Sequence, residues 1–362
     1  MTAVDEAATI GPADGKPSVD GSTVAAGRAT RLLAAVGLLT IAVAALVLYN
    51  LTQGEPDHSL STALDNLLRT GPIAGDIDSI LIREVRLPRV LMALLAGSAL
   101  GLAGVLLQDA LRNPLADPTL LGVAQGAGFV IALASIYPEL VPPLPTSVLC
   151  FIGGTLAGSV VLVLSRRSRN PVRVVLAGAM VSILFATLSS VVILITPRTR
   201  GLGIIEYFRF VIGSFIDVTW DSIGAVLPWF LLAVPLGLAS ARIVNLLSLG
   251  DEAASSLGLN PGRARIGLMI LSMALVTPYV AQIGPIGFVA LFAPHVSRSL
   301  IASSDALRVM ITSAFAGALM LLTADTAARL LFFPFEVPAG VFTFLIVGPL
   351  ALVIVGRLGR SR

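Results

Sequence analysis

Apolar residues occupy this chain in long blocks separated by short polar stretches, from about residue 30 almost to the last residue. A run of roughly 20 apolar residues is long enough to cross the hydrocarbon core of a bilayer as an α-helix. We therefore expect an all-α fold, a polytopic membrane protein with about ten transmembrane helices. The predicted segments are residues 32–51, 90–107, 119–137, 146–164, 174–195, 223–241, 266–283, 284–301, 309–324 and 337–356.

The start of the apolar pattern sets the domain boundary. The N-terminal residues are rich in Ala, Gly, Asp, Ser and Thr without apolar periodicity, so residues 1–29 are predicted to be a disordered cytoplasmic tail. The first apolar run, 32–51, is long for the core of a signal peptide and has no clear cleavage site, so we expect a first span. Residues 30–362 then form one membrane domain, in which 203–216, with two central charges, predict a short interfacial helix.

Composition supports the membrane assignment and gives an orientation. The chain is 56% hydrophobic and only 12% charged, whereas a soluble domain carries roughly 25% charged residues. If both termini are cytoplasmic, 16 of the 24 Lys and Arg residues fall on the inner side. Because basic residues are enriched in cytoplasmic loops, we expect a multi-pass protein of the plasma membrane with both termini in the cytoplasm.

Several classes of function lack the residues that they need. The only lysine, Lys16, does not fit the glycine pattern of a P-loop, so any ATP hydrolysis belongs to another chain. The two histidines, His58 and His295, have no cluster of metal ligands around them, so we expect no metal site and a structural hydrogen bond for His295. There is no nucleophile–base–acid arrangement, and the arginines are dispersed, so neither a membrane enzyme nor nucleic-acid binding is expected.

The stretch 86–128 is the most informative part of the chain. An arginine pair precedes an apolar run of membrane length. A polar elbow follows the run, and a second apolar stretch, rich in glycine, begins after the elbow. Asp117 and Pro118 predict the start of the next helix, because Asp is a preferred N-cap and Pro fits the first helical position. In chain order the motifs are Arg-Leu-Pro-Arg at 86–89, Gly-Ser-Ala-Leu-Gly-Leu-Ala-Gly at 97–104, Gln108, Asn-Pro-Leu-Ala-Asp-Pro at 113–118, Leu-Gly at 121–122 and Gly-Ala-Gly at 126–128.

This block resembles the permease subunits of the ABC importers for ferric siderophores, haem and vitamin B12, and the similarity extends from about residue 30 to 357. The resemblance implies the permease fold of the vitamin B12 importer, in the bacterial inner membrane. It also implies a second permease subunit, identical or paralogous, two ATPase subunits that bind ATP and Mg, and an extracytoplasmic substrate-binding protein, with no cofactor in this chain. Ferric siderophore is the cargo that we favour, and haem and cobalamin are the alternatives.

The largest inner loop, about residues 243–265, contains LSLGDEAASSLGLNPGRAR. Its pattern predicts two short helices, because acidic residues follow one glycine in a first turn and an Asn-Pro pair can begin a second helix. The loop is either an ordinary solvated loop or a docking element for a partner. The resemblance favours docking, since it matches the family's coupling loop for the ATPase at Gly250, Asp251, Glu252, Ala253, Leu257 and Gly258.

Arg86 and Arg89 lie at the outer mouth of the second span, three residues apart, so on a helix they share a face. The residues alone allow two interpretations, namely side chains that reach to the membrane interface or a docking site. The resemblance implies docking, in which these two arginines and Arg329, in Ala-Asp-Thr-Ala-Ala-Arg-Leu at 324–330, contact glutamates on the two lobes of the substrate-binding protein.

Polar residues that face the inside of a helix bundle are candidates for a transport path. Gln108 either lines such a path or makes a hydrogen bond at the end of its helix. The resemblance places a cytoplasmic gate at Asn113 and Leu115 in the elbow, and at Pro171 and Val172 at the start of the fifth segment. Some relatives have small hydroxyl residues at the latter position, where this chain has Pro-Val.

The main alternative to an ATP-driven importer is an ion-coupled secondary transporter, which usually needs a carboxylate within the membrane. Asp325, at the end of a segment, is the nearest candidate for such a carboxylate. Asp and Glu do not occur in the segments 90–107, 119–136, 146–164, 174–195 and 266–283. The sequence therefore favours the importer subunit.

Overall fold

The computed structural model describes residues 21–53, 59, 61–62, 65–66, 77–118, 122–165, 171–197, 201–332 and 335–345. Residues 339–345 are the described part of a last helix. The other elements are α1 (Gly21–Thr52), α3 (Ile77–Ile80), a π-helical turn (Leu81–Arg86), α4 (Leu87–Leu111), α5 (Val123–Ile136), a 3-10 turn (Pro138–Leu140), α6 (Thr146–Ser165), α7 (Pro171–Leu194), α8 (Gly201–Ile212), α9 (Trp220–Ala239), α10 (Ala241–Ser248), α11 (Asp251–Ser256), α12 (Pro261–Ile283), α13 (Val289–Ile301) and α14 (Ala306–Leu330).

The prediction of an all-α, polytopic membrane fold is confirmed. Within the described residues, the stretches long and apolar enough to span a membrane are Thr30–Thr52, Ile77–Leu111, Leu176–Leu194, Trp220–Ser248, Pro261–Ile283 and Ala306–Leu330. Shorter apolar helices cover Val123–Ile136, Val148–Val161 and Val289–Ile301. Together with the helix at 339–345, these stretches match the predicted segments in order along the chain.

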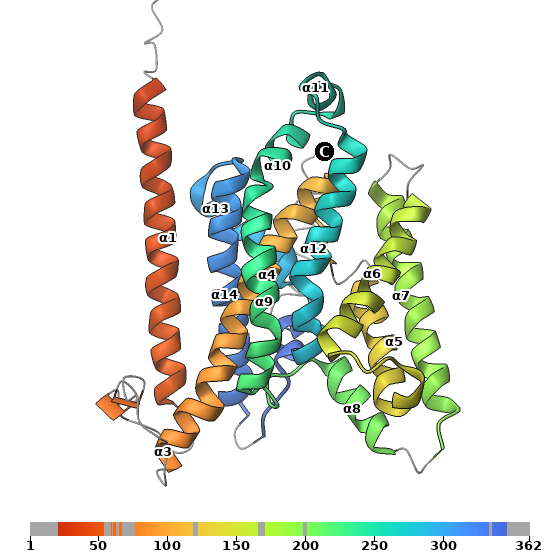
Figure 1. Ribbon diagram of the computed structural model, residues 1–362. Helices are drawn as coiled ribbons and strands as arrows, with labels where there is room; N and C mark the ends of the chain where they lie inside the picture. The colour runs from red at the N-terminus through yellow and green to blue at the C-terminus, as the bar shows by residue number, and fades with distance from the viewer. Residues whose placement is uncertain are drawn as a thin grey trace, which may run out of the picture.

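α4 forms the centre of the bundle. Most of its residues are buried, and α14, α12, α13 and α9 pack around it. α1 lies at the periphery, where it packs mainly on α14, while α5, α6 and α7 form a second group that joins the bundle through α12 (Figure 1). The central position of α4 explains its composition, since a helix that is covered on all sides can be apolar around its whole circumference.

The helix that leads into the centre runs without a break from Ile77 to Leu111, but the section Leu81–Arg86 is a π-helical turn. Pro88 gives a physical reason for the wider turn, because proline has no N–H to donate and its ring crowds the carbonyl group four residues earlier. The Arg-Leu-Pro-Arg motif thus starts at an irregularity of the helix, a feature that is frequent at functional sites.

Glycines allow α4 to approach α14 closely. Small residues four apart, such as Gly97 and Gly101, are typical of helices whose backbones come into contact. A Cβ added at Gly101 would overlap the carbonyl oxygen of Ser313 in α14, and one added at Gly97 would overlap the backbone of Gly317. The Ser313 hydroxyl donates a hydrogen bond of 2.8 Å to the Gly101 carbonyl oxygen. The crossing therefore depends on the absence of side chains.

Replacing Gly101 with Ala is expected to lower the yield of folded protein, because the added methyl group must displace the backbone of α14. Overpacking of this kind costs about 1–3 kcal/mol. Gly37→Ala in α1 is the matched control, since nothing lies within 4 Å of a Cβ added there. The measurement is size-exclusion chromatography of the two variants in detergent, and equal monodisperse peaks would contradict the prediction.

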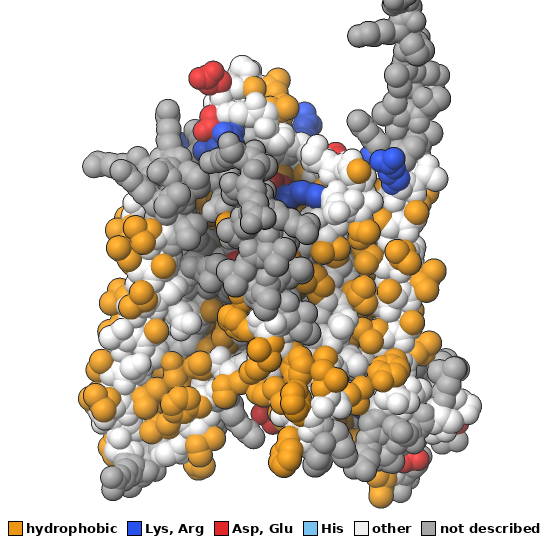
Figure 2. Space-filling model, turned by 180° about the vertical axis from the view of Figure 1, so that it is seen from behind, with side chains coloured by type: hydrophobic (Ala, Val, Ile, Leu, Met, Phe, Trp, Pro, Cys, Tyr) orange, Lys and Arg blue, Asp and Glu red, His pale blue; other side chains and the backbone are white. Residues whose placement is uncertain are grey.

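The two ends of the bundle differ in character. The N-terminal end of α1 and the short helix α11 lie at one end, and α3 and α8 lie at the other (Figure 1). On the face shown in Figure 2, hydrophobic side chains cover the flanks, and the Lys and Arg side chains gather toward the α11 end. Basic residues mark the cytoplasmic side of a membrane protein, so we treat the α11 end as cytoplasmic in the proposals below.

The tail and the interfacial helix differ in length from the sequence predictions. α1 begins at Gly21, inside the range 1–29 that was assigned to the tail, and residues 1–20 lie outside the described part of the chain. The helix expected at 203–216 is α8, and it ends earlier because Gly213, at φ +71°, is in the left-handed region and terminates it.

Two spans begin later than the sequence predicts. Pro118 is in 3-10 helical conformation, so a helical turn does follow Asp117, but α5 itself begins after Gly122, whose φ of +80° is incompatible with an α-helix that passes through it. The span expected to start at residue 284 begins after Phe288, because Gly284 at φ +73° and Phe288 at φ +70° interrupt the helix. Positive φ values of this kind are set by tertiary packing and leave little trace in an apolar pattern.

Candidate functional site

At the α11 end of the bundle, Asp251 links three helices. The carboxylate of Asp251, the first residue of α11, accepts hydrogen bonds from Nη2 of Arg112 at 2.7 Å and from Nη1 and Nη2 of Arg265 at 3.0 and 2.6 Å. Arg112 directly follows α4, and Arg265 lies near the start of α12. The same guanidinium groups also donate to the carbonyl oxygens of Leu247 and Ala110. α11 is therefore tied to both α4 and α12.

The surface of α11 that faces away from the bundle is partly apolar. Leu249 and Leu257, on either side of the helix, are 63% and 61% exposed. Glu252 is exposed between them, Ala253 is half-buried, and Ala254 is buried toward the bundle. Exposed apolar side chains next to a charge are typical of a surface that contacts another protein. The arrangement agrees with the coupling interpretation of this loop, whose contact with an ATPase stays a prediction.

The local structure of the loop follows its sequence. Gly250 at φ +108° and Gly258 at φ +83° turn the chain on the two sides of α11, in conformations that favour glycine. The side chain of Asn260 accepts a hydrogen bond of 3.1 Å from the backbone N–H of Arg263, and Pro261 is the first residue of α12. The predicted pair of short helices with an Asn-Pro start is therefore present.

Gln108, near the end of α4, connects this helix to α13. Its side chain is buried, and its Nε2 donates to the Leu291 carbonyl oxygen at 3.0 Å. Arg298 of α13 donates to Oε1 of Gln108 at 2.8 Å and to Asp109 at 2.9 Å. The hydrogen bond that the sequence allowed for Gln108 at the helix end is present, and its role in a transport path stays a prediction. Arg298 and Asp109 were not predicted as partners.

The elbow after α4 has the shape expected of a tight turn. The side-chain oxygen of Asn113 accepts a hydrogen bond of 3.0 Å from the backbone N–H of Leu115, which is an Asx turn. The Leu115 side chain is exposed. Pro171 is the first residue of α7, while its side chain and that of Val172 lie outside the described residues. The gate role of these four residues stays a prediction.

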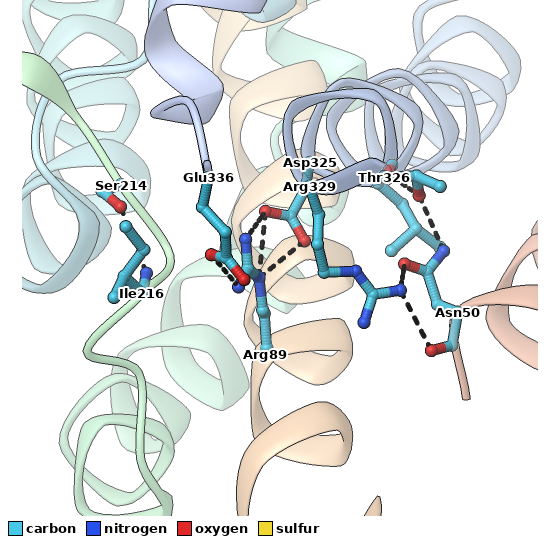
Figure 3. A network of polar contacts seen from close by, with 9 residues as sticks. Asn50, Arg89, Ser214, Ile216, Asp325, Thr326, Arg329 and Glu336 are labelled. Carbon is cyan, nitrogen blue, oxygen red and sulfur yellow. Dashed lines mark hydrogen bonds and ion pairs between the residues drawn. The ribbon is translucent and has the colours of Figure 1, made fainter. Parts of the chain in front are cut away.

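At the opposite end, Arg89 binds two carboxylates. Its Nε lies 3.1 and 3.0 Å from the two carboxylate oxygens of Asp325, and its Nη2 lies 2.9 Å from Oδ1 of the same residue. Its Nη1 donates to Glu336 at 2.9 Å. Figure 3 shows Arg89 rising from α4 between Asp325 of α14 and Glu336 of the segment that follows α14.

A second part of the same cluster fastens α1. Nη2 of Arg329 donates to the carbonyl oxygen and to the side-chain oxygen of Asn50 at 3.1 and 3.0 Å, and Asn50 donates to the Thr326 hydroxyl at 2.7 Å (Figure 3). Arg86 donates to the carbonyl oxygen of Leu51 at 3.0 Å. The end of α1 is thus held against both α4 and α14.

The structure brings the three predicted docking arginines to the same end of the bundle. Arg86 and Arg89 are only 4% and 8% exposed, and Arg329 is half-buried. Each therefore has partners within the chain, which the sequence analysis missed. The spacing of Asp325 and Arg329, four residues apart on one helix, suggests a pair between these two residues, but Asp325 binds Arg89 instead. Glu336 carries no local signal, because its contact with Arg89 depends on the tertiary fold.

Neither a cluster of metal ligands nor a special role for His295 is seen in the described residues. No group of three or more His, Cys, Asp or Glu residues in this part of the chain could hold a metal ion. The Nδ1 atom of His295 lies 2.9 Å from the carbonyl oxygen of Leu291, one turn earlier in α13, which is the structural hydrogen bond expected from the sequence. The bundle of apolar helices with polar clusters at its two ends defines a polytopic α-helical membrane protein.

Comparison with known proteins identifies the family. The model of the FecCD transport family matches residues 40–357. The Fe(3+) dicitrate transport system permease protein FecD of Escherichia coli (strain K12) is 33% identical over 320 residues, which cover 88% of this chain and 96% of that protein. The hemin transport system permease protein HmuU of Yersinia pestis is 37% identical over 284 residues, covering 77% and 84%.

A solved structure supports the same assignment. The inward-facing conformation of a metal-chelate type ABC transporter matches with a TM-score of 0.75 and 29% sequence identity, over 89% of this chain and 98% of that chain. The chain belongs to the FecCD transport family, and it is a transport permease rather than an enzyme.

Proposed function

We propose that this protein is the transmembrane subunit of an ATP-driven ABC importer that carries a ferric siderophore across the bacterial inner membrane. The similar permeases named above carry ferric dicitrate and hemin, and the similar solved structure is a transporter of the metal-chelate type. A bulky chelate suits a path between apolar helices, because it is handled by shape and weak contacts rather than by ion coordination. Haem and cobalamin are the alternative cargoes.

The observation that carries the ATP-driven mechanism is the geometry of α11. This short helix projects from one end of the bundle, presents Leu249 and Leu257 outward, and is tied through Asp251 to two long helices. Lys16 is the only lysine of the chain and does not lie in a P-loop, so the proposal assigns ATP and Mg binding to a partner. The full importer would then contain two permeases, two ATPases and an extracytoplasmic substrate-binding protein.

Ion coupling is the less favoured mechanism. An ion-coupled secondary transporter usually needs a carboxylate in the membrane that can bind and release the coupling ion during the cycle. Asp109 is the acidic residue of α4 and Asp325 that of α14, and each is ion-paired, to Arg298 and to Arg89 respectively. Each of these carboxylates therefore already has an arginine as its structural partner within the chain, which a coupling ion would have to displace.

The test is uptake of radiolabelled iron as ferric siderophore by cells that lack the gene and by cells that carry an intact copy. We expect uptake to be lost with the gene, to return with the copy, and to stop when ATP is depleted while the membrane potential is kept. Uptake that instead stops only on collapse of the potential would contradict the ABC mechanism. Parallel assays with ferric citrate, haem and cobalamin identify the cargo, and loss of one of these alone would overturn the siderophore assignment.

A further inference from the structure

The two carboxylates that bind Arg89 differ in their surroundings. The Asp325 side chain is 2% exposed and contacts both Nε and Nη2 of Arg89, whereas the Glu336 side chain is 38% exposed and contacts Nη1 alone. The bidentate pair with Asp325 has the geometry of a strong, fixed ion pair. The contact with Glu336 is a single bond at the edge of the cluster, so it is the one that can be exchanged.

The cluster also has a hydrogen-bond donor that is not used. Arg329 lies within electrostatic reach of Arg89, Asp325 and Glu336. Its Nε atom is buried and has no hydrogen-bond partner among the described residues. A buried donor without an acceptor costs free energy, which an incoming oxygen atom can recover. The cluster thus combines an exchangeable carboxylate with a nearby vacant donor.

We propose that Glu336 is an internal competitor that occupies the place of an acidic side chain from the extracytoplasmic substrate-binding protein. On docking, a carboxylate of the partner replaces that of Glu336 on Nη1 of Arg89. The inference rests on the proposed function, in which this arginine cluster receives the binding protein. It adds that the receptor site is already filled in the free permease, and that docking proceeds by exchange of one carboxylate for another.

The segment that carries Glu336 can release its side chain without losing its own position. The backbone N–H of Val337 donates to the Ala328 carbonyl oxygen at 3.2 Å, and that of Gly340 donates to the Gly213 carbonyl oxygen at 3.1 Å. These bonds anchor the start of the last helix independently of Arg89. The exchange therefore replaces one charge-assisted hydrogen bond by another, and the internal bond lowers the net affinity of docking by the amount that it contributes.

The test measures binding of the purified substrate-binding protein to the complete transporter in nanodiscs by surface plasmon resonance. Glu336→Gln is expected to tighten binding by about fivefold, since a partly exposed ion pair contributes up to about 1 kcal/mol. Glu336→Asp, which keeps the charge but shortens the side chain, should give a smaller gain. Glu139→Gln is the matched control, because Glu139 is an exposed acidic residue in another loop.

The reference for docking itself is the double variant Arg89→Leu/Asp325→Leu, which removes the arginine without stranding its buried partner. If this variant binds weakly while Glu336→Gln binds no better than the wild type, the competitor role is wrong and docking on Arg89 stands. If both variants bind like the wild type, docking on Arg89 is wrong and the competitor role falls with it. If Glu139→Gln also tightened binding, the loss of any negative charge on the permease would explain the gain, and the proposal would be overturned.

Discussion

Replacing Asp251 with Ala is expected to abolish most transport while the permease remains folded and bound to its ATPase. Asp251 is the residue through which α11 is bonded to Arg112 beyond α4 and to Arg265 in α12. In the proposed importer, movement of the ATPase reaches α11 first, and the ion pairs are the direct polar connection from there to the spanning helices. Without them α11 can move while α4 and α12 stay in place.

These ion pairs contribute little to stability, so an effect of Asp251→Ala on transport can be distinguished from an effect on folding. Asp251 and Arg112 are both 44% exposed, and Arg265 is 28% exposed. Pairs as exposed as these contribute about 0–1 kcal/mol, so their loss should leave the fold intact. Coupling between distant sites involves about 1–3 kcal/mol, which corresponds to changes of about 5–150-fold. We therefore expect a loss of transport on the order of tenfold or more with little change in thermal stability.

Transport and ATP hydrolysis should be measured together in proteoliposomes that contain the whole importer. Asp251→Ala and Arg265→Ala are expected to keep ATP hydrolysis and to lose uptake, whereas Arg263→Ala, which removes an exposed arginine two residues away, should behave as the wild type. Glu252→Arg and Gly258→Trp alter the outward surface of the loop, so they should release the ATPase instead. Normal uptake in Asp251→Ala would show that α11 transmits motion by another contact.

The hydrophobic pattern predicts the number and order of the spans because each span must be apolar over a fixed length, whatever its neighbours are. It fails at helix starts that tertiary packing decides. Gly122, Gly284 and Phe288 interrupt helices by positive φ values, and an apolar run does not record them. The two short helices of the loop 243–265 could be predicted, because the acidic first turn of α11 and the cap at Asn260 are local signals.

In the candidate sites, too, some features can be recognised in the sequence and others depend on the tertiary fold. The arginines stand out in the sequence because charges are rare in apolar segments, and the family resemblance points to them. Their partners do not stand out, since Arg89 meets Asp325 and Glu336 from more than 230 residues away in the chain. Pairing of this kind depends on how α4 and α14 cross, which is set by small residues such as Gly97 and Gly317. The residues of a single sequence give no direct information on that crossing.

Replacing Arg89 with Leu is expected to lower strongly the yield and the melting temperature of the folded permease, independently of any role in docking. The substitution would leave the 2% exposed carboxylate of Asp325 without its arginine. Removing one partner of a buried ion pair costs about 3–5 kcal/mol, because the remaining charge stays desolvated. A loss of this size is a large part of the stability of a typical protein.

The double variant Arg89→Leu/Asp325→Leu should recover most of the folded protein, since replacing a buried ion pair with apolar residues is often neutral or stabilising. Arg308→Leu, on the helix that carries Asp325, is the control, because Arg308 and Asp305 form a longer, partly exposed pair at 4.0 Å, whose loss should cost about 1 kcal/mol or less. Melting temperatures in detergent would rank the variants as wild type, Arg308→Leu, double variant and Arg89→Leu. A stable single variant would show that Asp325 tolerates the loss of Arg89, and the cluster would then have to be explained by binding alone. With the expected order, the double variant separates the two roles of Arg89, because it restores the fold and removes the charge that a partner would bind.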